Sequence, residues 1–123
     1  MAHPALSLLS GQSRGLTSWV MTMHPCIRAY FDAGSATPLH AFEPDAVVED
    51  EGHRHVGHAA IDEWWRESQV KYQAVALPLE VNAKGDACAV RARVTGQFPG
   101  SPITLTFEFR MKGERISALS IGA

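Results

Sequence analysis

The chain has 123 residues, which gives room for one domain with a hydrophobic core and one modest internal pocket. Hydrophobic residues make up 46% of it and charged residues 20%, and the net charge of −2 argues against nucleic acid or an anionic membrane as a partner. No apolar run approaches the roughly 20 residues that span a bilayer. Cys26 and Cys88 form no C-x-x-C pattern, so we expect free buried thiols in a reducing, cytoplasmic environment.

Residues 1–22 carry no periodic apolar pattern and lack the charged start and sustained apolar centre of a signal peptide. We expect a loose N-terminal extension over 1–22, a single domain over 23–123, and a natural translation start at Met21 or Met23. Pro25 suits the first position of a helix because its missing N–H would have no partner there. The segment from Pro25 to Gly34 therefore predicts a helix with glycine as its stop.

Two further helices and a hairpin follow. Residues 39–42 predict a short second helix that Pro44 ends, and residues 46–50 predict a short strand. A turn at residues 51–52 leads into residues 53–57 as the hairpin partner. Residues 58–71 predict the most clearly amphipathic helix.

The rest of the chain alternates with period two and predicts strands turned at residues 84–86 and 112–114, the last over residues 115–121. Helices first and long antiparallel strands afterwards is an α+β order. The apolar positions expected on the inner face are Val75, Leu77, Leu79, Val81, Cys88, Val90, Ala92, Val94, Ile103, Leu105, Phe107, Phe109 and Met111.

The segment FEPDAVVEDEGHRHVGHAAIDEWW, residues 42–65, combines an F-x-x-D-A-x-x-x-D strand, a hairpin and a G-x-x-A-I-x-x-W helix start. It resembles the nuclear transport factor 2-like superfamily, in its SnoaL-like and ketosteroid isomerase-like branch, and residues 94–119 resemble a bacterial subgroup of that family. The resemblance covers roughly Pro25 to the end of the chain. It implies a cone-shaped α+β fold, in which a curved antiparallel or mixed sheet wraps three N-terminal helices and forms an apolar pocket. Members are commonly dimers through the other face of the sheet.

Asp50 is the first candidate for catalysis. It shares strand parity with Val48, so it faces the core if Val48 does, while Glu49 points outward. A carboxylate beside an apolar cavity resists ionisation, which moves its pKa toward the range useful to a general base. Its position also resembles that of the proton-abstracting Asp of the ketosteroid isomerases. Alternatively, Asp50 ends the strand and caps the solvated turn that follows.

The resemblance places the two oxyanion donors of the isomerase near Ile27 and Phe107, neither of which can donate a hydrogen bond. We therefore do not expect authentic steroid isomerisation. Tyr30 lies about one helical turn from Ile27 and could direct its hydroxyl into the same cavity, and Trp65 is either a pocket residue or core packing. The expected substrate-binding residues are Tyr30, Ile27, Val48, Trp65, Phe107 and Phe109.

Three histidines, His53, His55 and His58, form the densest group of potential metal ligands. A zinc or iron site needs three or four converging ligands, and no clear fourth is present, so we expect no metal and no cofactor. His55 could instead act as an acid or base with Asp50, as in dehydratase-like members of the fold.

Two functions remain open, because this scaffold hosts both. We favour a small enzyme of isomerase, cyclase or dehydratase type, in which Asp50 shuttles a proton on an apolar carbonyl or polyketide-like molecule. The alternative is a non-catalytic module that binds a small apolar molecule or dimerises. In either case we expect a homodimer through the polar strand face that carries Arg91, Thr95, Thr106 and Glu108, and no nucleic-acid or membrane partner.

Overall fold

The computed structural model describes residues 23–34 and 36–123, so the expected extension over residues 1–22 lies outside the described part of the chain. The described part contains two α-helices, α3 (Pro25–Phe31) and α4 (Gly57–Tyr72), with the 3-10 helix η1 (Leu39–Ala41) between them. Neither of these helices has the length and apolarity needed to cross a membrane.

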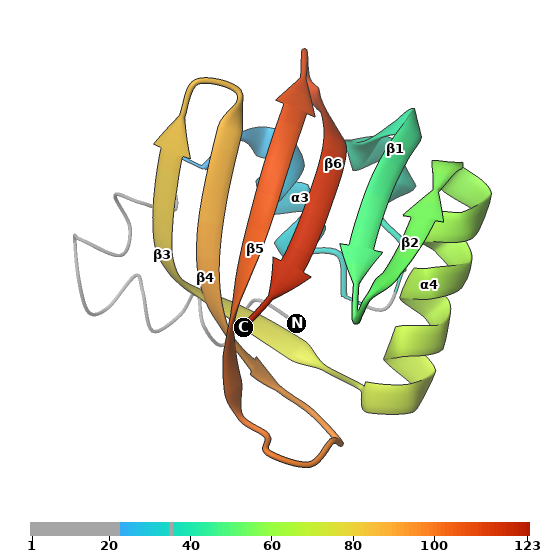
Figure 1. Ribbon diagram of the computed structural model, residues 1–123, viewed down its shortest axis with the longest axis vertical. Coiled ribbons are helices and arrows are strands. Elements are labelled where there is room, and N and C mark those ends of the chain that lie inside the picture. The colour runs from blue at the N-terminus through green and yellow to red at the C-terminus, as the bar shows by residue number, and fades with distance from the viewer. Residues whose placement is uncertain (1–22, 35) are drawn as a thin grey trace.

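The strands form one mixed six-stranded sheet in the order β2-β1-β6-β5-β4-β3 (Figure 1). Strands β1 and β6 are parallel, and the other neighbours are antiparallel. This is the predicted α+β class. The strands are β1 (Phe42–Asp50), β2 (His53–Val56), β3 (Val75–Lys84), β4 (Ala87–Thr95), β5 (Ile103–Lys112) and β6 (Arg115–Gly122).

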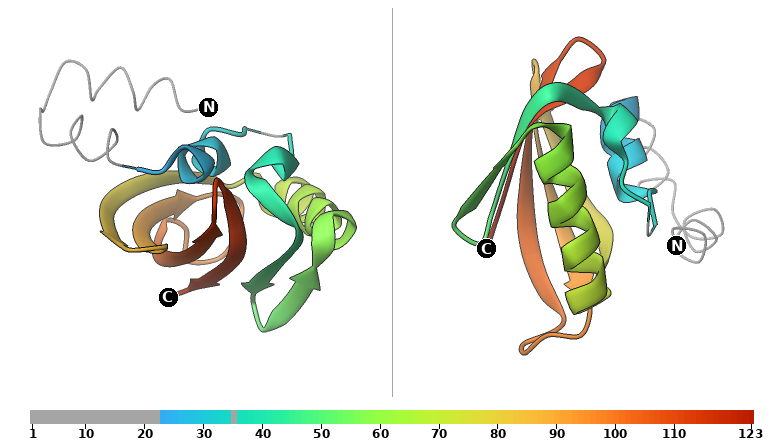
Figure 2. Two further views of the ribbon diagram at one scale, coloured as in Figure 1. Left: turned by 90° about the horizontal axis from the view of Figure 1, so that it is seen from above. Right: turned by 90° about the vertical axis from the view of Figure 1, so that its right-hand side faces the viewer.

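The sheet is strongly curved, and α3 and α4 lie on its concave side (Figure 2). The concave side also carries the residues that have no solvent contact or almost none, which we call the closed core. Its largest side chains are Phe42, Phe109, Ile27, Ile61, Ile116, Leu119, Val48 and Val90.

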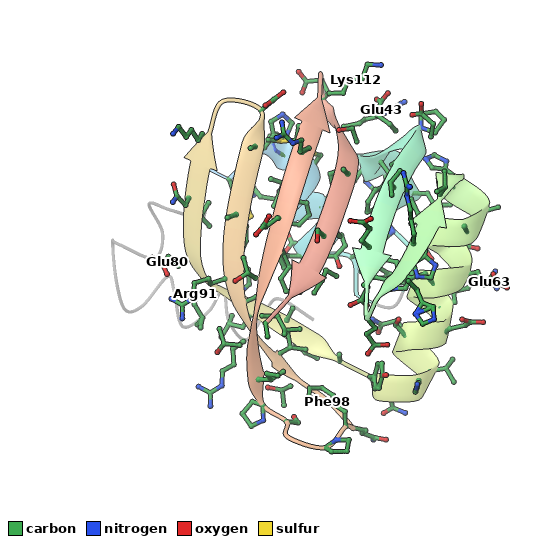
Figure 3. The ribbon with its side chains drawn as sticks, in the orientation of Figure 1. Glu43, Glu63, Glu80, Arg91, Phe98 and Lys112 are labelled. Atoms are coloured by element: carbon green, nitrogen blue, oxygen red, sulfur yellow. The ribbon has the colours of Figure 1, made fainter. Side chains whose placement is uncertain are left out.

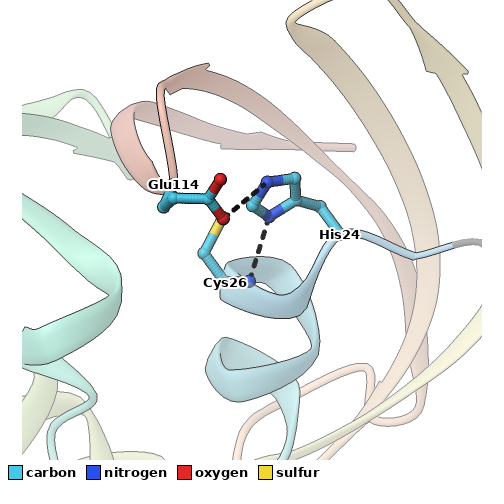
Figure 4. A network of polar contacts seen from close by, with 3 residues as sticks. All are labelled: His24, Cys26 and Glu114. Atoms are coloured by element: carbon cyan, nitrogen blue, oxygen red, sulfur yellow. Dashed lines mark hydrogen bonds and ion pairs between the residues drawn. The ribbon is translucent and has the colours of Figure 1, made fainter.

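Helix α3 begins at Pro25 as predicted and ends at Phe31, three residues before Gly34. Its first turn is capped by the imidazole of His24, whose Nδ1 accepts a hydrogen bond from the backbone N–H of Cys26 at 3.1 Å (Figure 4). The other ring nitrogen, Nε2, lies 3.9 Å from a carboxylate oxygen of Glu114 in the β5–β6 turn. The imidazole of His24 therefore connects the first turn of α3 to the β5–β6 turn.

Strand β1 is longer than predicted, because it starts at Phe42 and includes Pro44. The expected second helix is correspondingly short and consists of η1 alone. Proline cannot donate to a strand ladder, and the pairing of β1 with β6 is irregular between Phe42 and Val47, where Pro44 lies. The interruption in the ladder accommodates the proline.

The predicted inner face of β3 is wrong at its beginning. The register between β3 and β4 shifts between Pro78 and Glu80, and one extra residue in a strand exchanges the faces of all residues on one side of it. Val81, after the shift, lies opposite the buried Val90 of β4. Before the shift, Val75 and Leu77 point outward, with 54% and 40% of their surface exposed.

Candidate functional site

A cavity of about 1440 Å³ opens between the helices and the concave face of the sheet. Its walls come from α3, the second half of α4, strands β3 to β5, the β4–β5 loop and the ends of β1 and β6. The β4–β5 loop lies at the bottom of Figure 1. It is larger and more open than the modest pocket expected for this chain length. Of the predicted site residues it is lined by Asp50, Tyr30, Trp65 and Phe107.

Asp50 lies on the inner face of β1 with the fully buried Val48, as strand parity predicts, and Glu49 is exposed on the other face. The Asp50 side chain is half-buried, and its Oδ2 accepts a hydrogen bond from the indole Nε1–H of Trp64 at 3.1 Å. Burial raises the pKa of Asp50 above the ordinary value of 3.8, and the negative charge of Glu51 adds to this effect. The hydrogen bond from Trp64 and the proximity of His55 oppose the rise in pKa without cancelling it.

Tyr30 projects from α3 into a group of aromatic rings at the same cavity. Its ring meets that of Trp65 edge to face at 5.3 Å and that of Phe109 at 5.4 Å. Burial raises the pKa of Tyr30, and the charge of Asp50 raises it further, so the hydroxyl stays protonated at neutral pH. No described residue hydrogen-bonds this hydroxyl, and no fully buried polar side-chain atom in the described part of the chain lacks a partner. Tyr30 is one of the residues that line the cavity.

Trp64 and Trp65 are consecutive residues of α4 with different surroundings. Their rings meet edge to face at 6.0 Å, and both side chains are more than nine-tenths buried. Trp65 packs on Tyr30, whereas Trp64 reaches the carboxylate of Asp50. The sequence analysis did not predict this hydrogen bond, because no local pattern relates a helix residue to a strand residue fourteen positions away.

His55 does not line the cavity. It lies on β2 opposite Val48, and its ring is 6.0 Å from that of Trp64 at an angle of 33°. The other two histidines diverge from it: a ring nitrogen of His53 lies 3.1 Å from the carbonyl oxygen of Glu51, and one of His58 lies 2.9 Å from that of Phe42. Among the described residues no group of three potential ligands could hold a metal ion.

Three of the predicted substrate-binding residues are elsewhere. Ile27, Val48 and Phe109 belong to the closed core, with exposed fractions of 0%, 0% and 1%, and they do not line the cavity. Of these three, Phe109 packs against the ring of Tyr30, which does line the cavity. These residues were expected in the pocket because they point inward. An inward position, however, is found both for residues in the packed core and for residues that line the cavity.

Tyr72, the last residue of α4, joins three segments at the cavity mouth. Its hydroxyl donates to Oε2 of Glu51 at 3.0 Å, in the turn that follows Asp50. Its carbonyl oxygen accepts from the backbone N–H of Gln97 at 2.7 Å, and its ring meets that of Phe98 edge to face at 5.9 Å. Figure 3 labels Phe98 on the β4–β5 loop. No sequence pattern predicts this junction.

The outer face of the sheet carries the polar residues expected there. Arg91 of β4 forms an ion pair of 2.6 Å with Glu80 of β3, and both side chains are more than half exposed (Figure 3). Thr95 and Glu108 are exposed on the same face, and Thr106 is half-buried.

Residues 27–119 match the family model described as the SnoaL-like domain. The chain belongs to the SnoaL-like family. A search of the curated proteins finds no match.

Solved structures agree with this assignment. The SnoaL-like protein is 47% identical to a candidate polyketide cyclase from Sinorhizobium meliloti, with a TM-score of 0.79 over 82% of this chain and 96% of that one. A protein of ketosteroid isomerase-like fold from Catenulispora acidiphila, solved with trimethylamine, has a TM-score of 0.70 at 18% identity over 82% and 87% of the two chains. The epoxide hydrolase/cyclase-like enzyme SalBIII, of pyran ring formation in salinomycin, has a TM-score of 0.67 at 20% identity over 79% and 86%. The last two show the shared fold alone.

Proposed function

We propose that this SnoaL-like protein is an enzyme that removes a proton next to a carbonyl group of an apolar, polyketide-like substrate, with Asp50 as the general base. The observation that carries the proposal is a half-buried carboxylate with a raised pKa at a large cavity. The likeness to the candidate polyketide cyclase from Sinorhizobium meliloti supports the substrate class.

In the proposed reaction, the carboxylate of Asp50 takes a proton from the carbon beside the carbonyl group. The electron pair of that C–H bond moves to the carbonyl oxygen, which gives an enolate. The Tyr30 hydroxyl, protonated and without a described partner, donates a hydrogen bond to this oxygen. In an isomerisation, Asp50 then returns the proton to another carbon of the conjugated enolate. In a cyclisation, the enolate carbon bonds to a second carbonyl carbon, the π electrons of that carbonyl group move to its oxygen, and Asp50 gives its proton to this oxygen.

In the proposed reaction Tyr30 is the hydrogen-bond donor to the enolate oxygen, a role that Ile27 and Phe107 cannot fill. Neither of these side chains can donate a hydrogen bond, and Ile27 has no exposed surface at all. The proposed enzyme therefore uses one donor, Tyr30, for the enolate oxygen and differs from a steroid isomerase, which uses two.

The test is hydrogen–deuterium exchange at the α-carbon of β-tetralone, an apolar ketone, followed by NMR in D₂O. Exchange needs only proton removal and enolate stabilisation, so it does not require the natural substrate. We expect catalysed exchange that falls by about two to four orders of magnitude in Asp50→Asn. In Tyr30→Phe we expect a loss of about two to three orders of magnitude, typical of one oxyanion donor.

Glu49→Gln is the matched control, because it removes the neighbouring carboxylate on the outer face of the same strand. It should leave the exchange rate unchanged. Exchange no faster than in buffer, or an Asp50→Asn variant as active as the unaltered protein, would overturn the proposal.

The apolar rim of the cavity favours a second candidate, a module that binds an apolar molecule without chemistry. Phe98, Ile103 and Leu105 line the cavity toward its mouth. If β-tetralone binds, as measured by quenching of tryptophan fluorescence, but does not exchange, this candidate replaces the enzyme.

We also propose a homodimer through the outer face of the sheet. The register shift in β3 places Val75 and Leu77 on this face, opposite Thr95 and Arg93 of β4, which makes the face partly apolar. Light scattering at micromolar concentration should give the mass of two chains, and Leu77→Glu should give the mass of one. A monomeric unaltered protein would contradict the proposal.

A further inference from the structure

We propose that Trp64 is a positioning residue for Asp50, and that its indole N–H holds Oδ2 and so fixes the orientation in which the carboxylate takes the proton. This inference rests on the proposed role of Asp50 as a base. The contact is the 3.1 Å hydrogen bond between the two side chains. Trp64 is the side chain that donates to this carboxylate, and the backbone N–H of Glu51 is a second donor beside it.

The indole is itself held in place by its neighbours. Trp64 lies in the middle of α4, and its ring is enclosed by the edge of Trp65 at 6.0 Å and by the ring of His55 at 6.0 Å. Only 8% of its surface is exposed. A carboxylate at the end of a strand, next to a turn, can rotate about its side-chain torsions, and one fixed donor selects a single orientation.

An indole suits this task because it is a donor only and carries no charge. A lysine or arginine at this place would pair with Asp50 and lower its pKa strongly, which would make it a weak base. The indole stabilises the ionised carboxylate less, so Asp50 is oriented while its pKa remains raised by burial.

Other titratable groups surround Asp50 and must be considered in any pH experiment. Glu51 follows it in the turn, His53 lies opposite it on β2, and His55 lies beside Trp64. Tyr30 faces the same cavity from α3. The neighbour on β6, Ile121, is not titratable.

The first test uses the unaltered protein, which avoids any question of folding. We expect the indole N–H resonance of Trp64 to shift with pH at the pKa of Asp50, as followed by the ¹³C signal of that carboxyl. The resonance of Trp65 should shift much less. The Trp64 shift should disappear in Asp50→Asn. A Trp64 resonance that does not respond while Asp50 titrates would overturn the proposal.

The second test is Trp64→Phe, which keeps an aromatic ring and removes the N–H donor. The pKa of Asp50 should rise by about one unit, because a hydrogen bond to a charged group is worth at least that much. Tyr72→Phe is the matched control: it removes a hydrogen bond from the same helix to Glu51, the next residue. It should move the pKa of Asp50 much less. An unchanged pKa in Trp64→Phe would contradict the positioning role.

With β-tetralone, Trp64→Phe should lower kcat by about tenfold, leave KM nearly unchanged, and move the acid limb of the pH profile upward. Loss of activity with an unshifted limb would indicate a purely structural role and overturn the proposal. Separate results would overturn the proposed role of Asp50 as the base and the proposed role of Trp64 as its positioning residue. If Asp50→Asn remains fully active, the proposed function fails, whereas the NMR titration decides the Trp64–Asp50 contact without reference to activity.

Discussion

The closed core and the cavity lie side by side on the concave face of one sheet, and they use the same strands differently. In the closed core, Phe109 and Val48 have no more than 1% of their surface exposed. Two residues along from each of them, Phe107 and Asp50 line the cavity. Strand parity is the same in both places. An inward residue therefore belongs to the closed core where a helix packs against it, and it lines the cavity where no helix side chain fills the space opposite it.

The largest difference between the closed core and the cavity is expected when one aromatic residue is truncated in each region. Phe109→Ala should lower the free energy of unfolding by about 3–5 kcal/mol, because it leaves a void in a packed core. Phe98→Ala at the cavity mouth should cost only about 1 kcal/mol, typical of a partly exposed site. Chemical denaturation measures both. Equal losses would mean that the two regions are packed alike.

A smaller effect is expected at the loop that bounds the cavity. A methyl group on Gly96 would lie 2.7 Å from the carbonyl oxygen of Tyr72 and 3.0 Å from Cα of Ala74. Both atoms are backbone, so Gly96→Ala should destabilise the protein by about 1–3 kcal/mol. The control is Gly122→Ala, where nothing lies within 4 Å. If Gly96→Ala is as stable as Gly122→Ala in thermal melts, the loop is not docked on the end of α4.

The smallest effect should be seen at the cysteines, which test whether the closed core excludes solvent. Cys26 and Cys88 are each 4% exposed, and burial raises the pKa of Cys26 to about 11 and also raises that of Cys88. Little thiolate is present at neutral pH, so iodoacetamide should modify neither thiol in the folded protein. Mass spectrometry before and after denaturation checks this. Rapid native labelling would show that the core opens.

Strand periodicity was sufficient to predict most of the sheet. The inner faces of β4 and β5 follow the predicted alternation, and the turn positions agree with it. The prediction was wrong for Val75 and Leu77 because a single extra residue near Leu79 exchanges faces, and alternation in the sequence continues through it unchanged. A bulge is fixed by the pairing partner, which lies on another strand.

The candidate site was predictable only in part. The inward orientation of Asp50 could be predicted from the alternation in its own strand. The place of Tyr30 at the cavity could be predicted from its position on its own helix. The contacts of Trp64 with Asp50 and of Tyr72 with Glu51 join a helix to a strand end, so they depend on how α4 lies against β1. Residue patterns within one element carry no information about that placement.

Burial disfavours the ionised form of the Asp50 carboxyl group and so raises its pKa. The most direct test is the free energy of unfolding of the unaltered protein relative to Asp50→Asn, measured by denaturation across pH. Between the ordinary pKa of 3.8 and the raised pKa of the folded state, the folded protein binds more protons than the unfolded chain. The unaltered protein should therefore lose stability relative to Asp50→Asn as pH rises through this window, and the difference should be constant above it. A difference that is flat over the whole range, or that changes in favour of the unaltered protein as pH rises, would contradict the account.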